Sequence, residues 1–371
     1  MKRMRKISIL LKPTDECNFR CKYCYHADSN YEKGRMSIEL FEEIIRKSFS
    51  DYTHIKLIFH GGEPLLMGHD WFEKTFNIMR RYQNKNQNLK ISLQTNGYFL
   101  DQKFCDLFLE NDVSIGVSFD GPGKLNSLRD KTDEVTEKII SLRTKGYKIG
   151  LLGVVTKRNL NGLKTFYEFA KENGCDLKLN PVFKSGAAKE EFDYLISAKE
   201  FVYELKELLP IWLKDENMAV EPLINLTAMT LIGRGISCAT CGCLSRWVAL
   251  NHDGTVFPCS RSYPKEYTFG NIKDVDHLSS VFDHENFTEL LKGAIERRSY
   301  CQKTCSYYPV CQGGCNNDAI LNGNITRPSG FMCEVYREMI PFIKNCIDNC
   351  LSEIKNQCVL KLTAKSKLME K

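Results

Sequence analysis

Three cysteines near the start of the chain have the spacing of a metal-binding site. They lie in the stretch CNFRCKYC, residues 17–24, which follows a short apolar segment at residues 7–11. Three thiolates can hold three irons of a four-iron cluster, and the fourth iron then keeps an open position for a substrate or cofactor. Three buried or zinc-binding cysteines are the alternative, because free cysteine is a common small core residue. The spacing therefore predicts a catalytic iron-sulfur site if the rest of the chain supplies a ligand pocket.

Polar and glycine-rich turns follow the next three apolar segments. Gly61 and Gly62 would let the backbone approach a ligand closely, and the Glu63 carboxylate could bind an ammonium group. Hydroxyl, carboxylate and guanidinium groups further along could bind a carboxylate or ribose hydroxyls. For the amides, polar capping of a strand is an equally good interpretation, and an arginine in a loop is usually just solvated. The candidate ligand-binding residues are Gly61, Gly62, Glu63, Gln94, Asn96, Ser118, Asp120 and Arg129.

Alternating strands and helices must position these residues. Apolar runs of strand length lie at 7–11, 55–59, 89–93, 113–119, 149–155 and 177–182. Amphipathic stretches between and after them predict helices at 37–51, 71–82, 102–110, 133–145, 160–173, 199–214 and 222–232. This alternation predicts an α/β fold in which a parallel sheet curls into a partial (β/α)6 TIM-like barrel. The active site of such a fold lies at the carboxyl ends of the strands, where all of the polar turns fall.

The texture of the chain changes near Gly233. Beyond it, glycine, cysteine and turn residues increase and regular periodicity fades, until residues 332–354 again resemble a helix. A stretch that buries little core for its length needs metal to hold it together. We therefore expect a barrel with its following helices at 1–233, a small cysteine-rich domain at 234–335, and a C-terminal helix with a basic tail at 336–371.

Composition excludes several classes of protein. Seventeen cysteines in 371 residues would indicate disulfides in a small secreted protein, but no signal peptide opens this chain. Reduced thiols at metal spacing, in the cytoplasm and in an anaerobic setting, are the better interpretation. No apolar run approaches a membrane span, and the net charge of +6 is spread without a dense basic block except at the ends. We expect neither a membrane nor a nucleic-acid partner.

The cysteine stretch resembles that of the radical S-adenosylmethionine (SAM) superfamily. Cys17, Cys21 and Cys24 match its motif, Tyr23 supplies the aromatic residue before the last cysteine, and Gly61-Gly62-Glu63 matches its GGE motif. In that family the open iron binds the amino and carboxylate groups of SAM, and an electron from the cluster cleaves SAM to a 5'-deoxyadenosyl radical. The resemblance implies that Tyr23 and the ligand-binding candidates named above contact SAM.

The later cysteines resemble those of a SPASM domain, which carries two auxiliary four-iron clusters. Cys243, ten residues, Gly254, four residues and Cys259 reproduce its opening pattern. The resemblance implies that Cys243, Cys259, Cys315 and an upstream thiol hold one cluster; we prefer Cys238 to Cys241 for that thiol. It assigns the other cluster to Cys301, Cys305, Cys311 and Cys333, with one extra residue between the first two. Zinc knuckles, or a non-catalytic iron-sulfur protein, are the alternatives.

Relatives of this layout oxidise peptides or proteins. Some install thioether or carbon crosslinks in ribosomally made peptides, others convert a sulfatase cysteine or serine to formylglycine, and a reduced flavodoxin or ferredoxin is the implied electron donor. The anaerobic sulfatase maturases place an aspartate, their catalytic base, directly after the cysteine that corresponds to Cys259; here Ser260 follows, and a hydroxyl cannot accept a proton as a carboxylate can. We therefore expect a peptide-crosslinking maturase first and a sulfatase maturase second. His26, just beyond the cluster loop, is a candidate base or substrate contact.

Overall fold

The curved parallel sheet is the element that positions everything else. The computed structural model describes residues 5–26, 33–188, 192–240, 242–261, 267–328 and 330–349. Its sheet contains β1 (Lys6–Leu11), β2 (His54–Phe59), β3 (Asn88–Thr95), β4 (Val113–Ser118), β5 (Ile149–Val155) and β6 (Leu177–Pro181), adjacent in chain order and all parallel. The predicted partial barrel is confirmed. Short connections join β3 to α3, whereas longer connections follow β1 and β6.

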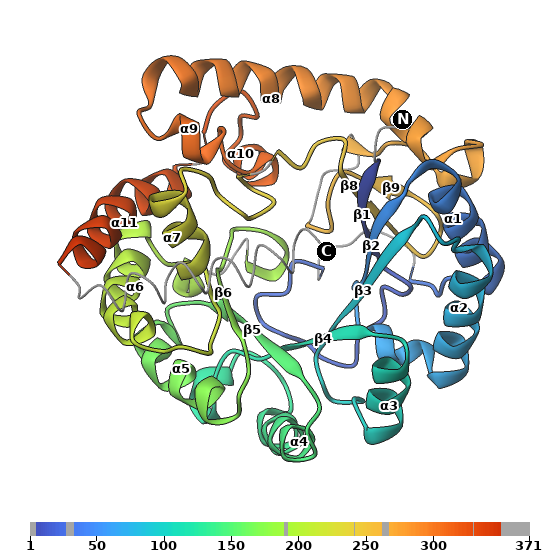
Figure 1. Cartoon of the computed structure of the whole chain (residues 1–371), viewed down its shortest axis with the longest axis horizontal. Helices are drawn as coiled ribbons and strands as arrows, with labels where there is room; N and C mark the ends of the chain where they lie inside the picture. Colours follow the sequence, from blue (N-terminus) through green and yellow to red (C-terminus); the bar gives the residue numbers. More distant parts are fainter. Residues whose placement is uncertain are drawn as a thin grey trace.

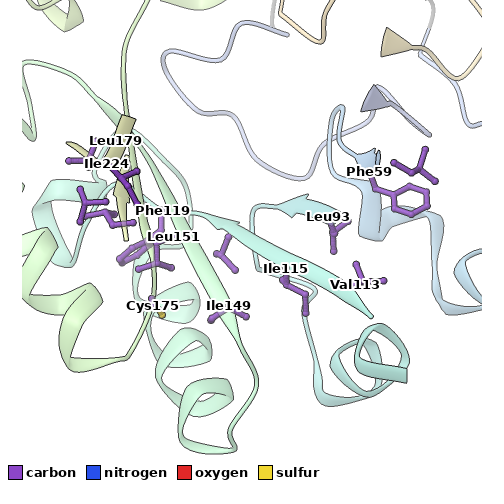
Figure 2. Packing of buried hydrophobic residues seen from close by; sticks show 14 of the residues in the cluster. Phe59, Leu93, Val113, Ile115, Phe119, Ile149, Leu151, Cys175, Leu179 and Ile224 are labelled. Atoms are coloured by element: carbon purple, nitrogen blue, oxygen red, sulfur yellow. The ribbon is translucent and has the colours of Figure 1, made fainter. Parts of the chain in front are cut away.

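The helices cover the outer face of this sheet (Figure 1). They are α1 (Ile38–Asp51), α2 (His69–Tyr82), α3 (Gln102–Glu110), α4 (Thr132–Thr144), α5 (Leu163–Glu172) and α6 (Ala198–Leu213). Alternate strand residues face them; in β1, for example, Ile7, Ile9 and Leu11 are buried. Figure 2 shows Phe59, Leu93, Ile115 and other apolar side chains of this core. The other set of strand residues, such as Ser8 and Lys56, therefore faces the barrel interior.

The sheet is wider than the sequence predicts. A short β7 (Val220–Glu221) extends it beside β6, and β8 (Trp247–Leu250) pairs in parallel with β1 at the opposite edge. A final strand, β9 (Val256–Phe257), pairs antiparallel with β8, which gives nine strands in the order β7-β6-β5-β4-β3-β2-β1-β8-β9. The cysteine-rich part of the chain is thus hydrogen-bonded to the first strand of the barrel, directly beside the loop that carries Cys17.

The expectation that regular structure fades after Gly233 is wrong for one long segment. Residues Glu285–Thr304 form α8, a helix of 20 residues, and the short α9 (Tyr308–Cys311) and α10 (Asn316–Leu321) follow. The buried stripe of α8 is narrow: it contains Phe287 and Leu290, and then small, basic and thiol side chains. Such a stripe gives a weak apolar period, so the helix is hard to find by pattern.

Two further helices close the fold. Helix α7 (Leu223–Leu231) follows β7, and α11 (Phe331–Asp348) packs against both α6 and α7. The predicted closing helix is present, although the structure ends it at Asp348 and the predicted residues 350–354 lie outside the described part of the chain. Within the described residues, none of these helices has both the length and the apolar character of a membrane span.

Candidate active site

The loop after β1 brings three thiols together. Phe19 and Tyr23 are buried and anchor the loop, while the Cys24 amide donates to the Cys21 carbonyl oxygen at 3.1 Å. Burial raises the pKa of Cys21 to about 11; Arg129 opposes this rise, and the neighbouring thiolates of Cys24 and Cys17 add to it. Groups that perturb one another in this way lie close together. The three thiols that the sequence predicts as ligands therefore lie close together in space.

Beside these thiols, the turn after β2 is packed tightly against the cysteine loop. A Cβ atom on Gly62 would lie 2.1 Å from the carbonyl oxygen of Glu16, and one on Gly61 would lie 2.7 Å from that of Thr14. Gly61 also has a positive φ of 116°. These positions consequently require glycine, because the turn approaches the chain's own backbone; the predicted approach to a ligand stays a prediction.

Glu63 is fully buried and held by three donors. Its carboxylate accepts hydrogen bonds from the Leu65 amide at 3.0 Å, the Thr95 hydroxyl at 2.7 Å and the Asn96 amide at 2.7 Å. Burial raises its pKa, although these three hydrogen bonds oppose the rise. A cation bound beside Glu63 would further stabilise the charged form, so the site suits the ammonium group that the sequence predicts.

Three of the predicted polar side chains lie at or just beyond the ends of β3 and β4. The Asn96 amide nitrogen donates to Asn18 Oδ1 at 2.8 Å and lies 3.9 Å from Cys17 Sγ. Gln94 Nε2 donates to Ser118 Oγ at 2.8 Å across the two strands. The structure thus places Asn96 beside Cys17, and it pairs Gln94 with Ser118 at the carboxyl ends of the two neighbouring strands.

Asp120 and Arg129 belong to a buried network around Tyr23. The Tyr23 hydroxyl donates to Asp120 Oδ2, and Arg129 Nη1 donates to the Tyr23 hydroxyl at 2.8 Å. Asp120 Oδ1 accepts the Val154 amide at 2.9 Å, so both carboxylate oxygens have partners inside the protein. Arg129 Nε is buried and has no hydrogen-bond partner among the described residues. Arg129 is therefore not a solvated loop residue, and its unused donor lies in the group that surrounds Cys21.

Two further sets of thiols form in the C-terminal half. In the first auxiliary group (Cys238, Cys243, Cys259 and Cys315), burial raises the pKa of Cys243 to about 12, and the thiolates of Cys238 and Cys259 add to the rise. Cys315 is likewise perturbed, mainly by burial and in part by Cys259. Cys238 thus lies with the other three, as the sequence-based preference has it. The alternative, Cys241, lies outside the described residues.

The second auxiliary group (Cys301, Cys305, Cys311 and Cys333) is built from the end of α8, from α9 and from the start of α11. Burial raises the pKa of Cys311 to about 12, and the thiolates of Cys333, Cys301 and Cys305 contribute. Within the described ranges, no three His, Cys, Asp or Glu side chains converge as closely as a single metal ion requires. A four-iron cluster binds each thiolate at a different iron, so its ligands stand further apart than those of one ion.

His26 and Ser260 belong to a polar cluster that also contains Tyr25, His60 and Lys12. The rings of His26 and Tyr25 are 4.3 Å apart, and those of His26 and His60 are 6.4 Å apart. The Tyr25 hydroxyl is hydrogen-bonded to the Ser260 side chain. Lys12 is buried and has a pKa lowered to about 8, chiefly by burial. Residues that follow β1 and β2 therefore lie near Ser260, the residue that follows Cys259.

Sequence reasoning did not identify Lys12, Tyr25 and His60, the other members of this polar cluster. Each had a local signal: Lys12 and His60 directly follow buried strands, and Tyr25 follows the last cluster cysteine. Their convergence depends on the β1–β8 pairing, which places Phe257 and Ser260 beside them. Polar residues at strand ends are candidates in any barrel, so position alone could have identified two of the three.

Comparisons with known proteins agree with this arrangement. The family model of the radical SAM superfamily matches residues 11–170, and that of the SPASM iron-sulfur cluster-binding domain matches residues 241–316. The chain belongs to the radical SAM superfamily and carries a SPASM domain.

Relatives over the whole length of this radical SAM protein are anaerobic sulfatase-maturating enzymes. A cysteine-type enzyme of Clostridium perfringens is 27% identical over 95% of this chain and 100% of its own length. A serine-type enzyme of Bacteroides thetaiotaomicron is 23% identical over 95% of this chain and 93% of its own length. The solved structure of polyhistidine-tagged anSMEcpe with bound AdoMet superposes with a TM-score of 0.82 at 25% identity, covering 95% of this chain and 98% of that one. Streptococcus suis SuiB bound to precursor peptide SuiA shares the fold, with a TM-score of 0.64, 16% identity and coverage of 89% and 76%.

His60 makes the stability of this radical SAM protein depend on pH. Burial, with Lys12 and Lys178 adding, lowers the pKa of His60 to about 4. Between that value and the unfolded pKa of about 6.5, the unfolded chain binds more protons, so this residue makes the protein less stable as pH falls. The free energy of unfolding should fall between pH 8 and pH 5.5, and we expect this fall to be about 1 kcal/mol smaller in His60→Gln than in the wild type. Anaerobic urea unfolding at both pH values would measure it.

The exposed His277, replaced in the same way, is the matched control. His277→Gln removes an exposed imidazole that is paired with Asp51, and it should not reproduce the reduced acid sensitivity expected of His60→Gln. If His60→Gln lost as much stability in acid as the wild type, this would contradict the placement of His60 in a buried site near Lys12 and Lys178.

Proposed function

We propose that this chain is a radical SAM maturase that oxidises a cysteine or serine side chain of a protein substrate to formylglycine. The observation that carries the proposal is the full-length similarity to sulfatase-maturating enzymes of both types, with a TM-score of 0.82 over 95% of the chain. A related structure, native anSMEcpe, contains AdoMet and the Cp18Cys peptide. The sequence alone favoured a peptide-crosslinking maturase; the comparisons support the second of the two expectations better.

Three sets of the chain's own residues suit the cofactors of such an enzyme. Cys17, Cys21 and Cys24 would hold the cluster that binds SAM, with Glu63 toward the ammonium group of SAM. The first and second auxiliary groups would each hold a four-iron cluster through four thiolates. When bound, these groups supply a hydrogen-abstracting radical at one end and an electron acceptor at the other.

The proposed reaction removes a hydrogen atom, a proton and an electron from the substrate, so it needs one proton acceptor. The Cβ of the target serine loses a hydrogen atom, its hydroxyl loses a proton and one electron is removed, which produces the aldehyde; a cluster held by one of the auxiliary groups would accept that electron when bound. A cysteine target loses the same three particles to give a thioaldehyde, and water then replaces the sulfur, which leaves as hydrogen sulfide. The proton acceptor that we propose is His26. Burial, with Lys12 and His60 adding, lowers its pKa well below its usual range, so its imidazole is neutral at neutral pH.

Ser260 is the observation that keeps a second function in view. The residue is buried and hydrogen-bonded to Tyr25, where the sulfatase maturases carry a carboxylate. A crosslinking maturase removes the same hydrogen atom and electron but joins the substrate radical to a second group, so it needs a different proton acceptor or none. The two functions differ in product and can be separated directly.

Reconstituted enzyme, SAM and reduced flavodoxin or dithionite, incubated anaerobically with a single-cysteine peptide, test the proposal. The expected product carries an aldehyde, detected with a hydrazide reagent and by mass spectrometry as the exchange of sulfur for oxygen with loss of two hydrogen atoms. The serine counterpart should lose two hydrogen atoms, and the alanine counterpart is the matched control. SAM cleavage with a product that keeps its sulfur and shows no aldehyde would favour the crosslinking function instead.

A further inference from the structure

A buried asparagine contacts a thiol of the first auxiliary group. Asn316 is the first residue of α10, directly after Cys315, and only 3% of its surface is exposed. Its amide Nδ2 donates to Cys243 Sγ at 3.5 Å. Cys243 and Cys315 are far apart in sequence, so Asn316 links a thiol from the loop before β8 to the helix that follows another thiol. No motif of the sequence singled out this residue.

Arg297 fixes the orientation of that amide. It lies on α8, is fully buried, and donates from Nε to the Gly313 carbonyl oxygen at 2.9 Å and from Nη1 to that of Ile325 at 2.6 Å. Its Nη2 donates to Asn316 Oδ1. A guanidinium group can only donate, so the amide oxygen of Asn316 must face Arg297. The amide nitrogen is thereby directed at the sulfur of Cys243.

The same arginine also lies near the second auxiliary group. Burial raises the pKa of Cys301 and of Cys333, and the positive charge of Arg297 opposes the rise at both thiols. Tyr336, buried on α11, lies within electrostatic range of Cys315 from the first group and of Cys311 and Cys333 from the second. Arg297 and Asn316 therefore occupy the protein between two neighbouring sets of thiols.

We propose that Asn316 raises the reduction potential of the cluster held by the first auxiliary group, and that Arg297 is the positioning residue that keeps its amide directed at Cys243. Hydrogen bonds to the sulfurs and nearby charge are among the factors that set the potential of a four-iron cluster. A donated N–H stabilises the reduced cluster, which carries one more negative charge, more than the oxidised one. The proposal rests on the cluster content of the proposed function, not on the formation of formylglycine.

The pair has a consequence for electron flow. The substrate radical gives one electron to an oxidised auxiliary cluster, so a higher potential at the first group makes that step more favourable. Removal of the Asn316 donor should therefore slow substrate oxidation while the cleavage of SAM at the other end of the barrel continues. That separation is what a merely structural role of Asn316 would not produce.

Midpoint potentials of the reconstituted holoenzyme, measured by redox titration with electron paramagnetic resonance, test the proposal. Asn316→Leu keeps the approximate size of the side chain and removes the donor, and Asn316→Asp adds a negative charge at the same place. We expect one midpoint potential to fall in both variants, further in the aspartate variant, while the others stay at the wild-type values. Arg297→Lys keeps the charge but gives up the planar fork, so the same potential should fall by less than in Asn316→Leu.

Asn322→Asp is the matched control, because it adds the same charge at the exposed C-terminal end of α10. Equal shifts in Asn316→Asp and Asn322→Asp, or unchanged potentials in both Asn316 variants, would overturn the proposal. If the variants do not incorporate their clusters, the wild-type protein provides a second test. Electron-nuclear double resonance before and after transfer to heavy water should show an exchangeable proton coupled to an auxiliary cluster. Absence of that proton would overturn the proposal, whereas failure to form formylglycine would leave it standing.

Discussion

The triple variant Cys17→Ala, Cys21→Ala, Cys24→Ala will cleave no SAM and form no product, yet it will keep its auxiliary clusters. The three thiols lie together in one loop and perturb one another, while the two auxiliary groups are built from other elements. Loss of one of three four-iron clusters should lower the iron content from about twelve to about eight atoms per chain.

Cys105→Ala is the control for a cysteine that only packs. Cys105 is fully buried on α3, in the core between helix and sheet. This variant should unfold somewhat more easily, because it loses buried volume, but should retain its full iron content and SAM cleavage. The measurements are iron analysis and chromatography of 5'-deoxyadenosine after anaerobic reduction. Formation of 5'-deoxyadenosine by the triple variant would contradict the assignment of the open iron to this loop.

Much of the barrel could be predicted because its signals are local. A buried strand that leads into a polar turn and an amphipathic helix, as at residues 55–82, identifies both elements and the edge that carries the site. Spacing indicated Cys17, Cys21 and Cys24 for the same reason, because they share one short motif, whereas the two auxiliary groups followed from the resemblance to a SPASM domain. The glycines at 61 and 62 were expected to let the backbone approach a ligand, whereas the structure shows them close to the chain's own cysteine loop, a contact that the sequence did not indicate.

Features that depend on tertiary pairing could not be predicted. Strands β7 and β9 have two residues each, too short for any periodicity, and α8 has a narrow apolar stripe. Sequence reasoning assigned Asp120 and Arg129 a ligand-binding role, but it could not indicate the Tyr23 network that surrounds them. The contact between Asn316 and Cys243, and the polar cluster around Lys12 and His60, likewise depend on strands and helices that are distant in sequence.

The second large effect concerns proton transfer. His26→Ala should lower product formation by about two to four powers of ten, the usual contribution of a general base, while SAM is still cleaved. His26 could take that role because its Nε2 atom is buried without a hydrogen-bond partner among the described residues, and a neutral imidazole nitrogen can accept a proton. His277→Ala, at an exposed position paired with Asp51, should leave both activities unchanged. The ratio of product to 5'-deoxyadenosine is the quantity to measure.

Restoring a carboxylate at position 260 tests whether the base can move. Ser260 is buried beside Tyr25, and the nearby cations Lys12 and Arg261 would stabilise a carboxylate there. If His26 takes over the role that an aspartate has in the sulfatase maturases, Ser260→Asp in the His26→Ala background should recover product by about ten-fold or more. In the wild-type background the same change should have a smaller effect, because a base is already present. A His26→Ala enzyme with unchanged product yield would remove His26 from the mechanism, and a double variant no better than His26→Ala would show that a carboxylate at 260 cannot reach the substrate.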